Sequence, residues 1–224
     1  MYGGVITGNT AGTGNAGGLQ NSKTAYLYGG SITNNKGYYG GVYNSGSLLV
    51  TGETQIIDNH GNESGGVYNS YGATLTVSGK IQITGNTCTE DKTAITSNVY
   101  LAKTFSNDQS ILTVGALTTG ENGAKIGVTT GKTPDYIYSK VQFATGRETY
   151  VTDAVKGCFF ADNGDYVVTR DGTTLYLGKH THRYAYALDN ANTIKVSCTE
   201  DSCPLDNGYI GSATLGAPAH KVYG

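Results

Sequence analysis

Two histidines and two cysteines near the end of this 224-residue chain have the spacing of a metal site. His180 and His182 are two residues apart, so on a strand both side chains would face the same side. Cys198 and Cys203 follow a predicted hairpin turn at residues 189–192, and two imidazoles with two thiolates can bind Zn²⁺ tetrahedrally. The preferred alternative is a disulfide between Cys198 and Cys203, which is typical of an oxidising compartment, and free thiols are a third possibility. No other cofactor is indicated.

Acidic side chains in the first part of the chain could support polysaccharide chemistry, but their sequence positions do not form a recurring pattern. They are Glu53, Asp58, Glu63, Glu90, Asp91, Asp108 and Glu121. A lyase needs clustered carboxylates for Ca²⁺ beside an Arg or Lys base, and an inverting hydrolase needs two carboxyl groups roughly 6.5 to 9.5 Å apart. Only Asp58 occupies a repeated position, and no arginine precedes Arg147. We therefore predict that the chain is not an enzyme. The alternative is a carbohydrate-active enzyme, a polysaccharide lyase or glycoside hydrolase, with an atypical site.

The elements that position these side chains come from an internal repeat of about two dozen residues. The segment GGVYN at residues 40–44 returns at residues 65–69. Asn9, Asn35, Asn59 and Asn86 end equivalent segments, at intervals of 26, 24 and 27 residues. Runs such as residues 47–51 and 73–77 between these marks have the alternation and β-branched content of short strands. A unit this small cannot bury an apolar face alone, so the repeats must stack on one another.

The repeat predicts an all-β fold, namely a right-handed parallel β-helix with three strands per turn. The residues expected to point inward are Val42, Val67, Leu75, Val77, Ile81 and Ile83. The four asparagines are expected to stack as a ladder at one corner, where Asn tolerates left-handed backbone geometry and side-chain amides can bond along the stack.

We assign residues 1–132 to the parallel β-helix and residues 133–178 to a β-hairpin cap, because bare strands at an open end would recruit other chains. Residues 179–224 are assigned to the start of a small β module. Within the β-helix, residues 87–93 are interpreted as an inserted loop, after which residues 97–101 return to the register of the GGVYN segment.

Tyrosine is unusually frequent, with 18 tyrosines and no tryptophan. Tyr43, Tyr68 and Tyr100 occupy equivalent positions of the repeat and are expected to form an outward row. Such a row could be a flat aromatic platform for sugar rings or a partner protein. It could equally stack to stabilise the sheet beneath it, and the two roles are compatible.

Composition excludes several classes of partner. Charged residues make up 14% of the chain and the formal net charge is −2, which does not favour nucleic acid or an anionic membrane surface. No apolar run approaches the length of a membrane span, so membrane insertion of this segment is not expected. Because the chain begins within a repeat, we expect it to be part of a longer protein with further domains.

Several segments of the chain, taken together, resemble a known group of proteins. The GGVYN repeats, the NVYL segment at residues 98–101, the IGVT segment at residues 126–129, the DNG turn at residues 162–164 and the His-x-His and two-cysteine module are similar to parts of very large surface proteins of gut Gram-positive bacteria. The likeness is to their pectate-lyase-like, adhesin-type β-helix regions. It covers residues 1 to about 178, and about 179 to 224 resemble the start of a repeated β module.

The resemblance implies an extracellular position at the bacterial cell surface and a non-catalytic structural or adhesive role. A host glycan or surface protein would then be the partner, bound through the exposed tyrosine face.

Overall fold

The computed structural model describes residues 1–106, 108–134, 140–179, 184–190, 193–198 and 209–214. Within these ranges the chain consists of β-strands and one short helix, α1 (Asp153–Lys156). The all-β class predicted from the sequence is therefore confirmed. The chain divides into two compact units, Met1–Lys179 and His180–Gly224.

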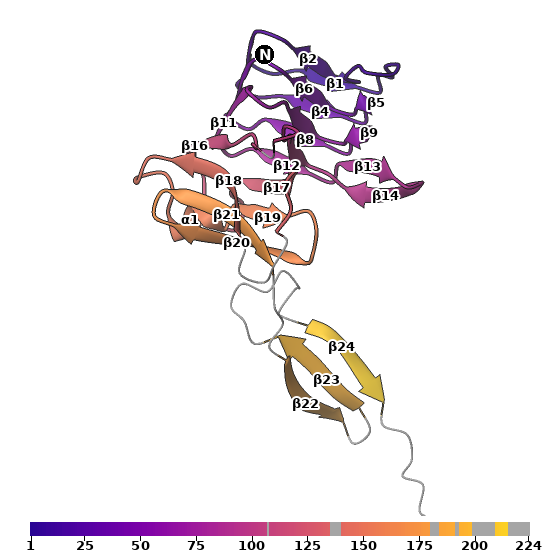
Figure 1. Ribbon diagram of the computed structural model, residues 1–224, viewed down its shortest axis with the longest axis vertical. Helices are drawn as coiled ribbons and strands as arrows, with labels where there is room; N and C mark the ends of the chain where they lie inside the picture. The colour runs from indigo at the N-terminus through magenta and orange to yellow at the C-terminus, as the bar shows by residue number, and fades with distance from the viewer. Residues whose placement is uncertain (107, 135–139, 180–183, 191–192, 199–208, 215–224) are drawn as a thin grey trace, which may run out of the picture. The chain divides into compact units, whose positions relative to one another are not determined.

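The first unit contains three sheets in which strands from successive repeats lie side by side (Figure 1). The largest is a curled sheet with the order β1 (Val5–Thr7), β4 (Ser31–Thr33), β8 (Gln55–Ile57), β12 (Gln82–Thr84), β17 (Lys125–Thr130), β15 (Val99–Leu101), β10 (Val67–Asn69), β6 (Val42–Asn44) and β2 (Leu19–Asn21), and β19 (Phe159–Ala161) also pairs with β17. A second sheet has the order β20 (Tyr166–Asp171), β21 (Thr174–Lys179), β18 (Lys140–Gly146), β16 (Leu112–Leu117), β11 (Thr74–Gly79), β7 (Ser47–Val50) and β3 (Thr24–Leu27). The third has the order β14 (Thr93–Thr96), β13 (Thr87–Glu90), β9 (His60–Ser64) and β5 (Lys36–Tyr39).

Strands of successive repeats pair in parallel and in register. Val67 of β10 lies between Val42 of β6 and Val99 of β15, so equivalent residues of the repeat are neighbours in space. A full repeat contributes four strands, as β4 to β7 illustrate, where three per turn were predicted. The strands are shorter than expected, which leaves room for a fourth strand and its corner within about 25 residues.

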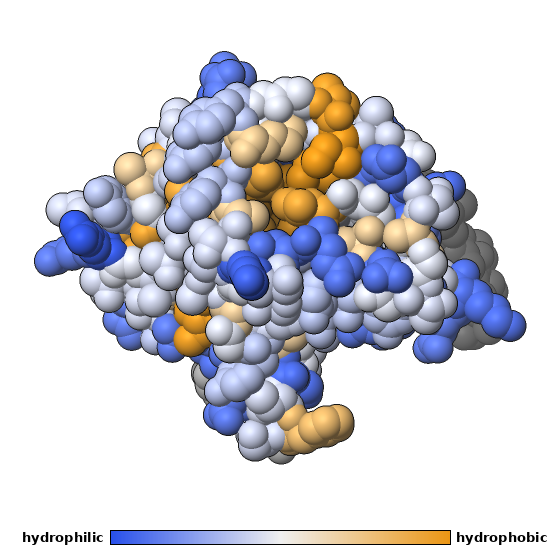
Figure 2. Space-filling view, turned by 90° about the horizontal axis from the view of Figure 1, so that it is seen from above, coloured by the Kyte–Doolittle hydropathy of each residue, from blue (hydrophilic) through white to orange (hydrophobic). Residues whose placement is uncertain are grey.

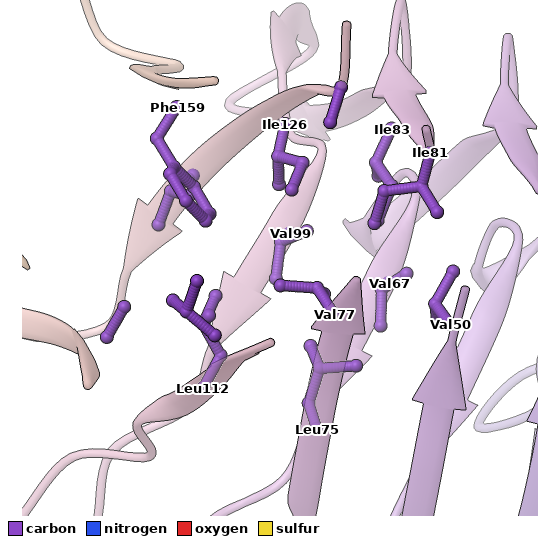
Figure 3. Close-up of a cluster of buried hydrophobic side chains, with 14 of the residues drawn as sticks. Val50, Val67, Leu75, Val77, Ile81, Ile83, Val99, Leu112, Ile126 and Phe159 are labelled. Carbon is purple, nitrogen blue, oxygen red and sulfur yellow. The ribbon is translucent and has the colours of Figure 1, made fainter. Parts of the chain in front are cut away.

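The core lies between the largest sheet and the second sheet. The six residues expected to point inward all have exposed fractions of 1% or less. Figure 3 shows Leu75 and Val77 of β11 beside Val67 and Val99 of the largest sheet, with Ile126 further along the same cluster. Because successive side chains of a strand point to opposite faces, every second residue of these short strands lies in the shared core.

Residues 87–96 form an antiparallel hairpin, so the loop predicted at residues 87–93 is wrong. Strands β13 and β14 pair directly, with Glu90 opposite Thr93. The two turn residues, Asp91 and Lys92, both have positive φ, at 46° and 68°. A two-residue turn of this kind matches the right-handed twist of the flanking strands, which is why the insertion folds as a hairpin.

The segment assigned to the cap begins as a continuation of the stack. Strand β18 pairs in parallel with β16, and β19 pairs in parallel with β17. Within residues 140–179, antiparallel pairing starts where β21 joins β18 and β20 joins β21. In the second unit, β22 (Tyr184–Asn190), β23 (Thr193–Cys198) and β24 (Tyr209–Thr214) form an antiparallel sheet.

Candidate functional site

The four asparagines expected to stack at one corner are joined by side-chain hydrogen bonds. Asn9 donates from Nδ2 to Oδ1 of Asn35 at 2.9 Å, Asn35 donates likewise to Asn59 at 3.0 Å, and Asn59 to Asn86 at 2.9 Å. The backbone N–H of each donates to the same oxygen of the next. The ladder continues to Asn98, whose Oδ1 accepts from Asn86 at 3.0 Å. Along the ladder, each asparagine therefore donates to the next one, while the Nδ2 atoms of Asn35, Asn59 and Asn86 also donate to a backbone carbonyl oxygen of the preceding repeat.

The left-handed position at this corner is the residue before each ladder asparagine, not the asparagine itself. Gly8, Asn34, Asp58 and Gly85 have φ between 54° and 69°. Glycine, Asn and Asp are the residues that adopt this geometry most readily, so the backbone explains why Asp58 occurs there. The backbone conformation therefore explains the presence of Asp58, the one acid in a repeated position, without a catalytic role.

The ladder ends at Asp162. The Oδ1 atom of Asp162 accepts from Nδ2 of Asn98 at 2.6 Å, and its Oδ2 accepts from the Asn98 backbone N–H and the Thr129 hydroxyl, each at 2.7 Å. Burial raises the pKa of the Asp162 carboxyl, while these three donated hydrogen bonds act in the opposite direction. The sequence interpretation missed this role because the Asp-Asn-Gly segment was assigned only as a turn.

A second ladder runs through the asparagines that end the GGVYN segments and the related segment GGLQN at residues 17–21. Asn21 donates to Oδ1 of Asn44 at 2.8 Å, Asn44 donates to Asn69 at 2.6 Å, and Asn69 donates to the Ser110 hydroxyl at 2.6 Å. This ladder was not predicted, although the repeated spacing of its asparagines carried the signal. Both ladders satisfy buried amides within the stack, which fixes the register of the repeats.

The three tyrosines of the predicted row lie in register and stack on one another. The ring centroids of Tyr43 and Tyr68 are 5.7 Å apart, and those of Tyr68 and Tyr100 are 5.3 Å apart, with interplanar angles of 18° and 14°. Tyr39 lies 4.5 Å from Tyr43 and 4.6 Å from Tyr68, and all these side chains are half-buried. Tyr39 therefore packs against Tyr43 and Tyr68, whereas Tyr100 lines a groove.

The packed tyrosines should ionise late in an alkaline titration. Burial, followed by the neighbouring Tyr43, Tyr38 and Glu63 groups, raises the pKa of Tyr39 to about 12. Burial is also the main cause that raises the pKa of Tyr68 and Tyr100. Because the folded pKa values exceed the ordinary value of 10.0, stability is unaffected below that pH and falls as the pH rises from 10 toward 12.

Phenolate absorbance of the folded chain should therefore show a late fraction near pH 12, and replacing Tyr39 by Phe should reduce it. Complete ionisation of all tyrosines near pH 10 without unfolding would contradict this packing.

The groove next to Tyr100 has a volume of about 970 Å³. Its walls come from the β13–β14 hairpin, the end of β9, strands β15 and β17, and the turn at residues 162–164. Four carboxylates line it, from Glu63, Glu90, Asp91 and Asp162. Among the described residues that line it there is no Lys, Arg or His. The groove therefore offers hydrogen-bond acceptors, an aromatic edge and a negative potential.

Two of the side chains that line the groove, Glu63 and Ser97, are partly or fully buried. Glu63 accepts a hydrogen bond of 3.3 Å from the Tyr38 hydroxyl and is half-buried. Ser97 is buried, lines the groove and lies beside the Cys88 thiol.

The predicted zinc or disulfide site lies outside the part of the chain that the structure describes. This holds for His180, His182 and Cys203, and for the side chain of Cys198. Elsewhere, Cys88 and Cys158 are buried free cysteines, and burial raises the pKa of both thiols. Within the described ranges no group of three or more His, Cys, Asp or Glu side chains could hold a metal ion.

Across the same ranges, no helix is long and apolar enough to cross a membrane.

Searches against protein-family models, curated proteins and solved structures find no match to this chain. The likeness to bacterial surface proteins therefore stands on the sequence segments alone, and the function proposed below depends on the geometry of the groove and the tyrosine row.

Proposed function

We propose that this chain is a non-catalytic scaffold of the bacterial cell surface that binds glycan at the groove beside Tyr100. We further propose that the stacked repeats form a right-handed parallel β-helix, which would make the scaffold stiff and place the groove at a fixed position along it. The proposed position on a Gram-positive bacterium rests on the sequence resemblance. The observation that carries the binding role is the meeting of an aromatic edge with several carboxylates in one groove.

The chemistry of the groove suits a sugar. Glycans present a flat apolar ring face and many hydroxyl groups, and sites that bind them combine an aromatic side chain with a few polar groups that fix orientation. Tyr100 supplies the aromatic surface, and the carboxylates of Glu63 and Glu90 can accept hydrogen bonds from hydroxyl groups. Tyr43 and Tyr68, which are packed under Tyr39, would hold Tyr100 in position as the end of their stack.

Charge selects among glycans. Four carboxylates with no basic side chain among the described lining residues would repel uronic and sialic acids. Neutral hexoses and N-acetylhexosamines carry no charge to be repelled. We therefore expect neutral glycans to bind and acidic glycans to bind weakly or not at all.

Replacing Tyr100 by Ser should weaken glycan binding by at least about tenfold, because it removes one of the two tyrosine side chains, Tyr100 and Tyr166, that line the groove. The binding constant of the full chain would be measured by calorimetry, with the neutral glycan that gives the strongest signal on an array. Tyr71, which is 51% exposed and does not line the groove, provides the matched control. Replacing Tyr71 by Ser should leave binding unchanged.

Two results would contradict the proposal. One is a wild-type chain that retains no neutral glycan on the array. The other is an equal loss of binding in the Tyr100 and Tyr71 variants while circular dichroism still shows β structure.

Hydrolysis of a bound glycan is the second candidate function, because carboxylates line the groove. Asp162 is poorly suited to it, since both of its oxygens already accept hydrogen bonds. Glu63, Glu90 and Asp91 remain, and an inverting mechanism would need two carboxyl groups about 6.5 to 9.5 Å apart across the bound sugar. New reducing ends after incubation with a neutral polysaccharide, abolished by replacing Glu63 with Gln, would favour hydrolysis over binding alone.

A further inference from the structure

The tyrosine row belongs to a column of outward side chains that crosses the largest sheet in register. Figure 2, which looks onto the end of the first unit where β1 and β2 lie in Figure 1, shows hydrophobic side chains in the middle and more hydrophilic ones around them. The outward column lies outside that apolar centre. In it, Tyr43 of β6 pairs with Tyr68 of β10, and Tyr68 pairs with Tyr100 of β15. The next strand is β17, where Thr129 is in register with Tyr100, so the aromatic column stops although the sheet continues.

The tyrosine rings repeat at nearly the spacing of the strands that carry them. The ring centroids are 5.7 Å apart between Tyr43 and Tyr68 and 5.3 Å apart between Tyr68 and Tyr100, with nearly parallel planes. Neighbouring strands lie about 4.8 Å apart. Tyr68 thus covers one face of the Tyr100 ring. A further ring at the same spacing would cover the other face and would lie above Thr129, whose side chain is too short to reach that position.

The groove lies at this position of the column. Both Tyr100 and Thr129 line it. The Thr129 hydroxyl donates to Oδ2 of Asp162 at 2.7 Å, which directs this short side chain along the sheet. Asp162 follows Ala161, whose partner on β17 is Val128, so Asp162 holds the next place in the column. The groove therefore contains an open stack position, above Thr129 and between Tyr100 and Asp162.

The groups around the open stack position favour a ring with hydroxyl groups on its edge. Glu63 and Glu90 line the same groove and can accept hydrogen bonds. An aromatic hydrocarbon ring has no donor for these acceptors, and its entry would take them out of water without compensation. A pyranose has an apolar C–H face that can stack on Tyr100 and hydroxyl donors around its edge.

We infer that one pyranose unit of a neutral glycan occupies the open stack position, stacked on the free face of Tyr100 above Thr129. The short side chain of Thr129 makes this position available, so Thr129 determines whether a sugar ring can enter. The inference rests on the proposed function. It adds the place of one sugar ring in the groove and the residue that controls access to it.

Thr129→Tyr tests the inference, because it supplies the missing ring from the chain itself. Calorimetry would measure the binding of neutral oligosaccharides of glucose, galactose, mannose and N-acetylglucosamine to the full chain. For the oligosaccharide that binds the original chain most tightly, the affinity of the variant should fall by at least about tenfold. Nuclear Overhauser contacts should also join the introduced ring to the ring of Tyr100.

Gln20→Tyr is the matched control. Gln20 of β2 is exposed, lies in register with Tyr43 at the other end of the row and does not line the groove. Its replacement adds a ring to the stack outside the groove, so the affinity should be unchanged. Thr129→Val removes the hydrogen bond to Asp162 and leaves the stack position open, so it should weaken binding clearly less than Thr129→Tyr.

A second measurement needs no variant. In the complex of the original chain with the same oligosaccharide, nuclear Overhauser contacts should join C–H protons of one sugar ring to the ring of Tyr100 and to the methyl group of Thr129. Their absence from a complex that forms would overturn the inference, even if the Thr129→Tyr variant did not fold.

Three further results would overturn the inference without removing the proposed function or would replace its ligand. Undiminished binding by a folded Thr129→Tyr variant would place the glycan elsewhere in the groove. An equal loss in the Gln20→Tyr variant would show that the open stack position is not the cause. Tighter binding of p-cresol, the analogue of a tyrosine side chain, than of any of the sugars would show that the occupant is aromatic. If none of the oligosaccharides binds the original chain, the proposed function fails and the inference fails with it.

Discussion

Replacing Asn59 by Leu is expected to lower the free energy of unfolding of the full chain by roughly 3 to 5 kcal/mol. Asn59 is buried in the middle of the ladder. It accepts from the backbone and side chain of Asn35, and its Nδ2 donates to Asn86 and to the Ile32 carbonyl oxygen. Leucine fills a similar volume but leaves several of these groups unpaired, each at a cost of about 1 to 3 kcal/mol. Urea denaturation followed by circular dichroism measures the change.

The neighbouring residue is the matched control for Asn59. Asp58 is exposed and adopts a left-handed backbone conformation that Asn34 adopts one repeat earlier. Replacing Asp58 by Asn should therefore change the free energy of unfolding by no more than about 0.5 kcal/mol. Similar losses in the two variants would show that the ladder amide has no special role.

Replacing Asp162 by Ala is expected to destabilise the end of the first unit by about 2 to 4 kcal/mol. The carboxylate accepts from the backbone and side chain of Asn98 and from Thr129, so its loss leaves three donors unpaired. These bonds also join β19 and its turn to the ladder, 64 residues away in sequence. Hydrogen exchange should therefore become faster in β19 than in β6 or β10, alongside the lower unfolding midpoint.

Two further variants test whether the loss of stability follows the number of hydrogen bonds removed. Thr129→Val removes one of the three donors and should cost about 1.5 kcal/mol or less. Asp165 lies in the same turn, and its exposed side chain makes no hydrogen bond in the described structure, so Asp165→Ala should have an effect near zero. An Asp162 variant as stable as the Asp165 variant would be incompatible with its role as the anchor of the ladder.

Contacts at the repeat spacing could be predicted from the sequence. Because strands stack in parallel and in register, each residue meets its equivalent about 25 residues later, and the intervals between Asn35, Asn59 and Asn86 express that distance directly. The inward valines and the stacked tyrosines follow for the same reason. The all-β class and the corner asparagines were therefore open to prediction.

Only the tertiary structure could decide the contacts that depart from this spacing. Strand β17 is long enough to pair with both β12 and β15, which joins two parts of the largest sheet. Asp162 meets Asn98 across 64 residues, and the groove combines Tyr100 with a hairpin that was assigned as a loop. A repeat specifies which residues meet at a constant separation in sequence. It carries no information about where the chain leaves the pattern and returns, because that is decided by the packing of strands whose separation in sequence is not fixed.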